Sequence, residues 1–237
     1  MSAVDSSVAG NGFYWVIVAL ANNADVNKSA SKLALEEADE AAFMNGVLAQ
    51  IAKLGSNMAD VESYLQNLIS EIQKDPQSNG GACLGQLQAL AQRIQTDEAQ
   101  ITNLQNQNTN DQNTVNQVSQ DMQEAASGNN FKKDFKEQHG FDIVADLIGA
   151  GIKYGTSIAR EAKDASTIQS LGNVIKGNND KIAAAQSDEQ TALNGVTEPM
   201  KTEANTLSGN SNTTLSGIST SLDESLSVLQ NLQVFLG

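Results

Sequence analysis

The sequence predicts an all-α protein whose long helices form antiparallel coiled-coil hairpins or an elongated helical bundle. First, apolar residues recur at alternating steps of four and three from Val26 to Ile72, interrupted only by Glu37 and Glu40, which is a heptad pattern. Second, the 237 residues include 2 Pro and 4% aromatic residues, a composition that favours thin helical bundles over a wide core. Third, no stretch of five or more residues alternates convincingly as a half-buried strand.

The composition also excludes several kinds of chemistry. The formal net charge is −14, whereas binding to nucleic acid needs a surplus of Lys and Arg, so we predict no nucleic-acid partner. One Cys and one His cannot form an internal disulfide or a Cys/His metal cage. We therefore expect no metal and no cofactor.

The N-terminal half begins with small polar residues, and we predict a disordered tail over residues 1–11. One helix is predicted over about 12–75, because the heptad pattern continues through Gly55 without a change of register and Pro76 follows it. Its early pattern includes Val26 and Leu33. The residues expected to form a helix-packing or oligomer seam are Val47, Ile51, Leu54, Met58, Val61, Leu65, Leu68 and Ile72.

A second helix is predicted over about 82–127, completing a long hairpin over 12–127. Its seam repeats every seven residues from Leu87 and Leu90, but Asp97, Asn108 and Asp111 occupy core positions. Two interpretations stay open. The helix packs loosely in solvent, which we favour, or these polar residues fix register and oligomeric state at a cost in stability.

A central helical region is predicted over 128–200, with an apolar segment at 141–159. This segment is either a core helix or a membrane-active element. The charges of Asp142, Asp146 and Lys153 favour the core helix, because each costs about 2.5–3.5 kcal/mol in mid-membrane. The apolar residues concerned are Phe141, Val144, Leu147, Ile148 and Ile152.

The C-terminal region, 201–237, is predicted to comprise a linker at 206–214 and a coiled-coil helix. A long first seam and a closing C-terminal seam predict that the two ends of the chain pair antiparallel. Whether helices cover one another within one chain or between chains stays open. The C-terminal seam residues are Leu215, Ile218, Leu222, Leu229, Leu232 and Leu236.

The titratable residues do not suggest a catalytic site. His139 lies in a charged connector without a Ser or Cys signature nearby. Cys83 follows Gly-Gly-Ala at a predicted helix start and is interpreted as a small apolar filler. The acidic cluster at 36–40 lacks the Glu-x-x-His motifs of metal-binding bundles and is interpreted as a solvated face. We predict no catalytic residues and no enzymatic activity.

The N-terminal apolar run is too short for a membrane span. It covers the nine residues Phe13–Ala21, with no Lys or Arg before it. We therefore expect secretion without a cleaved Sec signal, with a cytoplasmic location as the alternative.

Two features together resemble the EspA/SseB-type filament and translocator proteins of bacterial type III secretion. They are the apolar stretch that runs into a polar-faced helix at 16–28, and the leucine-rich helix at the C-terminus; the likeness covers roughly residues 13–75 and 213–237. The resemblance implies a secreted structural virulence protein, such as a filament, tip or translocator component. It also implies a homo-oligomer formed through terminal coiled coils, a cytoplasmic export chaperone, and contact with a host cell or membrane.

Two other classes of protein compete with this interpretation. A helical pore-forming toxin of the ClyA type would use the segment at 141–159 as its membrane-active element. A cytoplasmic coiled-coil adaptor would use the same seams to bind partners inside the cell.

Overall fold

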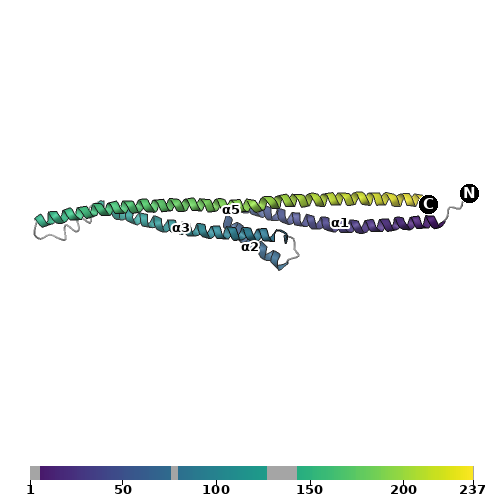
Figure 1. Ribbon diagram of the computed structural model, residues 1–237, viewed down its shortest axis with the longest axis horizontal. Helices are drawn as coiled ribbons and strands as arrows, with labels where there is room; N and C mark the ends of the chain where they lie inside the picture. The colour runs from purple at the N-terminus through teal and green to yellow at the C-terminus, as the bar shows by residue number, and fades with distance from the viewer. Residues whose placement is uncertain (1–5, 76–79, 127–142, 237) are drawn as a thin grey trace. The chain divides into compact units, whose positions relative to one another are not determined.

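A computed structural model describes the backbone of residues 6–75, 80–126 and 143–236, and the side chains of residues 12, 14–75, 80–123 and 162–234 (Figure 1). The described helices are α1 (Ser6–Leu54), α2 (Met58–Lys74), α3 (Leu84–Ala126) and α5 (Ile143–Leu236). The described ranges contain no β-strand. The prediction of an all-α protein is confirmed.

The chain divides into two compact units. Unit 1 contains Met1–Gln92 and Ala192–Gly237, and unit 2 contains Arg93–Thr191. The divisions therefore fall inside α3 and α5, and differ from the predicted boundaries after 127 and 200. A helix can continue from one compact unit into the next because its backbone hydrogen bonds are local. The residues that cover its apolar side change along its length.

Unit 1 has a core to which every one of its helices contributes. Met44 of α1, Leu65 of α2, Leu87 of α3 and Met200 of α5 are all fully buried. Of the seam predicted in the first half of the chain, Leu54 and Leu68 are half-buried. The remaining predicted residues of that seam are buried within this chain, namely Val47, Ile51, Met58, Val61, Leu65 and Ile72.

The prediction of a single helix over 12–75 is wrong, because α1 ends at Leu54 and α2 begins at Met58. Gly55 adopts φ +66°, a left-handed conformation that glycine reaches without a Cβ clash. Its N–H donates to the carbonyl of Ile51 at 3.1 Å, which closes the end of α1. The heptad spacing continues across the break, so spacing alone could not reveal it.

Two further predictions of irregular structure are corrected. The helix already begins at Ser6, so residues 6–11 are not a tail, while residues 1–5 lie outside the described part. The linker predicted at 206–214 is helical within α5. There the hydroxyls of Thr206 and Thr213 donate to the carbonyls of Thr202 and Gly209, four residues earlier. These hydroxyls bond to the helix backbone instead of competing with it.

In unit 1, α1 and the C-terminal part of α5 lie side by side and antiparallel (Figure 1). Asn23 donates a hydrogen bond to Ser225 at 2.9 Å, and Asn27 donates one to Ser221 at 3.3 Å. As the residue number rises on α1, that of its partner falls on α5. The prediction that the two ends of the chain pair antiparallel is confirmed.

In unit 2, α3 pairs antiparallel with the first part of α5. Arg93 forms an ion pair with Asp188, and Asn108 donates to Asn179 at 2.8 Å. The predicted hairpin over 12–127 is therefore wrong for residues 93–126, whose partner is α5. The predicted seam positions of α3 are confirmed as buried at Leu87, Leu90, Ile94, Asp97, Ile101 and Leu104.

No described helix combines the length and apolar character that crossing a membrane requires. The backbone of residues 143–159 in the predicted apolar segment is helical within α5. Phe141 and the side chains of Val144, Leu147, Ile148 and Ile152 lie outside the described residues, as do His139 and the side chain of Leu236.

Candidate functional site

The strongest candidate site is the surface of a two-helix arm in unit 1, formed by residues 14–33 of α1 and 214–234 of α5. Its contact seam consists of half-buried residues spaced by steps of three, four or seven. On α1 they are Val16, Leu20, Asn23, Asn27 and Ala30, and on α5 they are Thr214, Ile218, Ser221, Ser225 and Leu232.

The middle of this seam is polar. The Asn23 amide donates to Ser225, and its carbonyl oxygen accepts a 2.9 Å hydrogen bond from the Ser221 hydroxyl. Asn27 donates to the same Ser221 hydroxyl. These bonds form in one alignment of the two helices, because polar groups at seam positions find partners in one register.

Large apolar residues lie outside the seam on α5 and form a row of four exposed leucines. Leu215 and Leu222 each follow a seam residue by one position, which turns them about 100° away from the contact. Leu222 and Leu226 are each 53% exposed. Of the predicted C-terminal seam, Ile218 and Leu232 are thus half-buried in the arm. This chain leaves the leucine row (Leu215, Leu222, Leu226 and Leu229) uncovered.

A second apolar strip lies on the opposite flank of α1. Val26 is 65% exposed and Leu33 is 56% exposed, so neither lies in the seam that α1 forms with α5 in this chain. Asn23, Asn27 and Ala30 take the seam positions instead. The hydrophobic pattern did not reveal this contact between α1 and α5, because the pattern follows apolar side chains. The contact is formed by asparagine residues that are hydrogen-bonded to serine.

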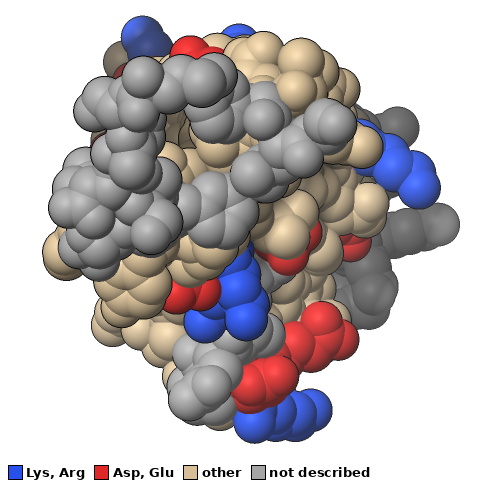
Figure 2. Space-filling view, turned by 90° about the vertical axis from the view of Figure 1, so that its right-hand side faces the viewer, with Lys and Arg blue, Asp and Glu red and all other residues tan. Residues whose placement is uncertain are grey.

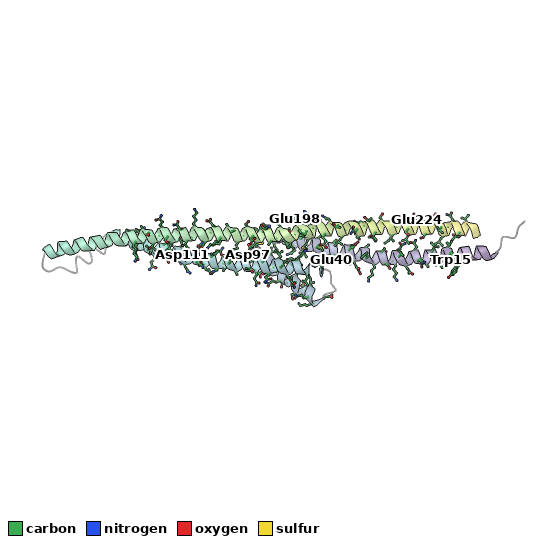
Figure 3. All side chains as sticks on the ribbon, viewed as in Figure 1. Trp15, Glu40, Asp97, Asp111, Glu198 and Glu224 are labelled. Carbon is green, nitrogen blue, oxygen red and sulfur yellow. The ribbon has the colours of Figure 1, made fainter. Side chains whose placement is uncertain are left out.

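The outward-facing side chains of the arm include an aromatic pair. The rings of Tyr14 and Trp15 meet edge to face, with centroids 5.6 Å apart. Trp15 and Glu224 project outward from α1 and α5 respectively (Figure 3). Seen from the end at which the chain termini lie, acidic and basic side chains are scattered among uncharged ones, and some of them adjoin one another (Figure 2).

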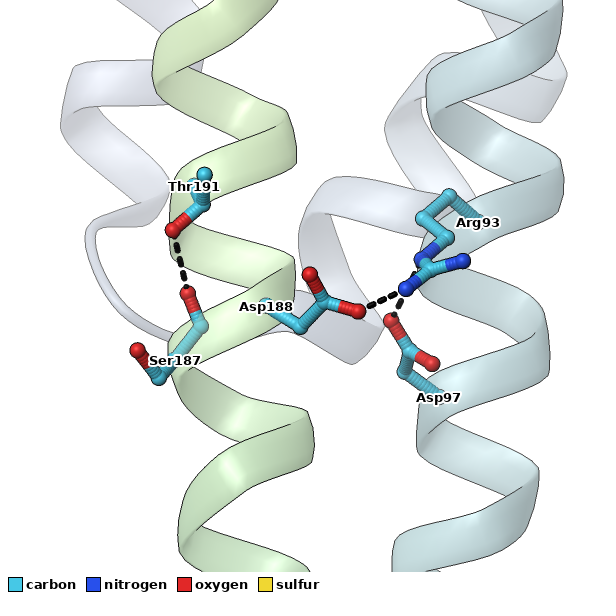
Figure 4. Close-up of polar contacts among 5 residues, drawn as sticks. All are labelled: Arg93, Asp97, Ser187, Asp188 and Thr191. Carbon is cyan, nitrogen blue, oxygen red and sulfur yellow. Dashed lines mark hydrogen bonds and ion pairs between the residues drawn. The ribbon is translucent and has the colours of Figure 1, made fainter.

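A second candidate is a buried carboxylate layer in unit 2, where α3 meets α5. Asp97 and Glu189 are only 6% and 1% exposed. The guanidinium of Arg93 lies 3.1 Å from the Asp97 carboxylate and also forms an ion pair with Asp188 (Figure 4). Burial, with added repulsion from Glu98 and then Asp97, raises the pKa of Glu189 to about 7.

The polar residues of α3 therefore contribute to helix pairing. Asn108 donates to Asn179 and accepts a 2.9 Å hydrogen bond from Asn178. The burial of Asp97 and the hydrogen bonds of Asn108 favour the interpretation that the polar residues of α3 fix the helix register. They disfavour a loosely packed helix. Among the described residues, no group of three or more His, Cys, Asp and Glu side chains could hold a metal ion.

The turn between α2 and α3 contains the single cysteine. Burial, and then the charge of Glu40, raises the pKa of the Cys83 thiol to about 11, and its Sγ donates to the Gly80 carbonyl at 3.3 Å. Such a thiol is protonated and poorly nucleophilic near neutral pH. Glu40 is half-buried and accepts a 2.9 Å hydrogen bond from the Gly80 N–H, so the acidic cluster at 36–40 is not entirely solvated.

Comparison of the chain with protein-family models, with curated proteins and with solved structures finds no match.

Proposed function

We propose that this protein is a non-enzymatic helical assembly protein that acts by coiled-coil self-association. We propose further that it is secreted without a cleaved Sec signal, as a filament, tip or translocator component of a type III secretion apparatus. The single observation that carries the proposal is the exposed leucine row of the arm, Leu215, Leu222, Leu226 and Leu229.

The leucine row supports assembly because it is an apolar strip that only the exposed Ser219, between Leu215 and Leu222, interrupts. The steps of seven, four and three residues place all four side chains along one side of α5, over a length of about 21 Å at 1.5 Å per residue. Single exposed leucines are ordinary, but four of them along one side of a helix mark a surface that a partner covers. Covering it contributes about 25 cal/mol for each Å² of apolar surface removed from water.

The same row supports the remaining parts of the proposal. An uncovered apolar strip would associate inside the cell before export, so we propose a cytoplasmic export chaperone that covers it. After export the arm would bind further copies and contact the host cell or membrane. The net charge of −14 supports protein partners over nucleic acid.

Sedimentation of the purified protein tests self-association. We expect oligomers, visible as discrete particles or filaments by negative-stain microscopy, and a shift to monomers in the Leu222→Gln, Leu226→Gln double variant. A wild-type protein that stays monomeric at high concentration would exclude the proposal.

A secretion assay tests the location separately. The protein should appear in the medium of cells with an active type III apparatus and stay inside cells whose apparatus is inactivated. Retention in both strains would leave the cytoplasmic adaptor as the better description.

A further inference from the structure

The face of the arm that carries the leucine row continues onto α1. In an antiparallel pair, the residues that directly follow seam residues on one helix lie on the same side of the pair as those that directly follow seam residues on the other. Because α1 and α5 are antiparallel, these two sets of residues form one face. On α5 these flanking residues include Leu215 and Leu222, which follow Thr214 and Ser221. On α1 the equivalent residues follow Val16, Asn23 and Ala30, and they are Ile17, Ala24 and Ser31.

We call this surface the leucine face and define it as Ile17, Ala24, Ser31, Leu215, Leu222, Leu226 and Leu229. The side chains of this face differ in size between the two helices, since α5 contributes large ones and α1 contributes mainly small ones. Ile17 is exposed like the leucines, Ala24 is exposed, and Ser31 is half-buried.

Charged residues of the arm avoid the leucine face. Asp25 and Lys32 of α1 lie on the outward side of the arm, as Asp223 does on α5, and Glu224 lies on the opposite flank. Lys28 alone lies at the edge of the leucine face. Depletion of charge distinguishes the buried centre of a protein interface from the rest of a surface.

We propose that the leucine face is covered by the leucine face of a second copy of this chain, so that two arms form a four-helix bundle around a twofold axis. This inference rests on the proposed function, because it identifies the partner and the geometry of the self-association. On α5 the flank beside the seam carries leucines, and an apolar flank beside a seam is typical of helices in bundles, where each helix has two neighbours.

The second copy fits this face by shape and by charge. A twofold axis parallel to the helices places α5 of one arm over α1 of the other, so the leucine row meets the small side chains at Ala24 and Ser31. Large side chains opposite small ones pack without voids. The same arrangement brings Lys28, at the edge of the face of one copy, toward Asp223 on the outward side of α5 in the other copy, which gives opposite charges at the rim.

The opposite flank of the arm supplies a matched control. Val26 and Leu33 are apolar and more exposed than the leucines, but they lie on the other face. We compare Leu222→Gln, Leu226→Gln with Val26→Gln, Leu33→Gln in the full-length protein, by sedimentation equilibrium. Helical content by circular dichroism shows whether each variant is folded.

We expect a wild-type dimer, or an assembly built from dimers, whose dissociation constant rises at least tenfold in the leucine variant and less than threefold in the control. If the control variant dissociates and the leucine variant does not, this face is wrong while self-association stands. If the wild type is monomeric, both the interface and the proposed function fail. An odd number of copies, such as a trimer, would contradict the twofold bundle.

Discussion

Asn23 and Ser225 are joined by a 2.9 Å hydrogen bond across the seam of the arm, although 202 residues separate them in the sequence. The same asparagine accepts a hydrogen bond from Ser221. Polar groups in the seam therefore align the two ends of the chain. The larger leucine side chains beside the seam point away from the contact. This alignment sets which side chains the arm presents to a partner.

Removing the Asn23 side chain should weaken the pairing of α1 with α5. We expect Asn23→Ala to lower the free energy of unfolding by about 0.5–1.5 kcal/mol, because it leaves two serine hydroxyls without this partner. Urea denaturation followed by circular dichroism measures the change. Exposed Asn22→Ala is the control and should cost less than about 0.5 kcal/mol. Equal losses in both variants would show that the seam bonds contribute nothing.

Stability should depend on pH through Glu189. Its folded pKa of about 7 lies above the ordinary value of 4.5, so the folded protein retains a proton that the unfolded chain releases. The associated stability is fully present below about pH 4.5 and is lost as pH rises through about 7. We therefore expect a lower melting temperature at pH 8 than at pH 5.

Glu189→Gln should flatten this pH dependence, because glutamine resembles the protonated acid. Exposed Glu198→Gln is the control and should retain the wild-type slope of melting temperature against pH. The Glu189 carboxyl can also be titrated directly by nuclear magnetic resonance. A wild-type slope in Glu189→Gln, or a titration midpoint near 4.5, would refute the assignment.

Gly80→Ala should destabilise unit 1. Gly80 has φ +100°, and a Cβ added there would lie 2.5 Å from ring carbons of Phe43. We expect a loss of about 1–3 kcal/mol in the free energy of unfolding, from the strained backbone and the displaced ring. In the control Gly85→Ala, the new methyl lies in open space within α3 and should stabilise by about 0.5–1 kcal/mol. Thermal unfolding shows whether each variant is less or more stable than the wild type.

Equivalent leucine truncations should differ in effect according to their burial. Leu65 is fully buried in the core of unit 1, so Leu65→Ala should cost about 2–5 kcal/mol. Leu222→Ala removes an exposed side chain and should change the stability of the monomer by less than about 0.5 kcal/mol. Denaturation at low protein concentration isolates the monomer. A comparable loss at Leu222 would mean that the chain itself covers the leucine row.

Cys83 should be inert in the folded protein. Its buried thiol has a pKa of about 11, so little thiolate exists near neutral pH. We expect a thiol-reactive dye to label the native protein very slowly and the denatured protein at once. Rapid labelling of native protein would show that the turn before α3 opens readily.

The helical class and much of the core follow from the pattern of apolar residues. The spacing of Leu87, Ile94 and Ile101 identified the buried side of α3, because apolar residues at heptad spacing specify one side of a helix. It also identified Leu65 and its neighbours on α2. These positions were readable because burial there follows hydrophobicity directly.

The position of the helix break, the pairing of the helices and the exposure of the leucines depend on contacts between distant parts of the chain. The left-handed conformation of Gly55 interrupts a pattern whose spacing does not change, so periodicity could not locate it. In the arm, Asn23 satisfies its polar groups with Ser221 and Ser225, and the leucine beside Ser221 turns outward. Hydrophobic spacing identifies the apolar sides of a helix, but the partner helix determines which side becomes the seam.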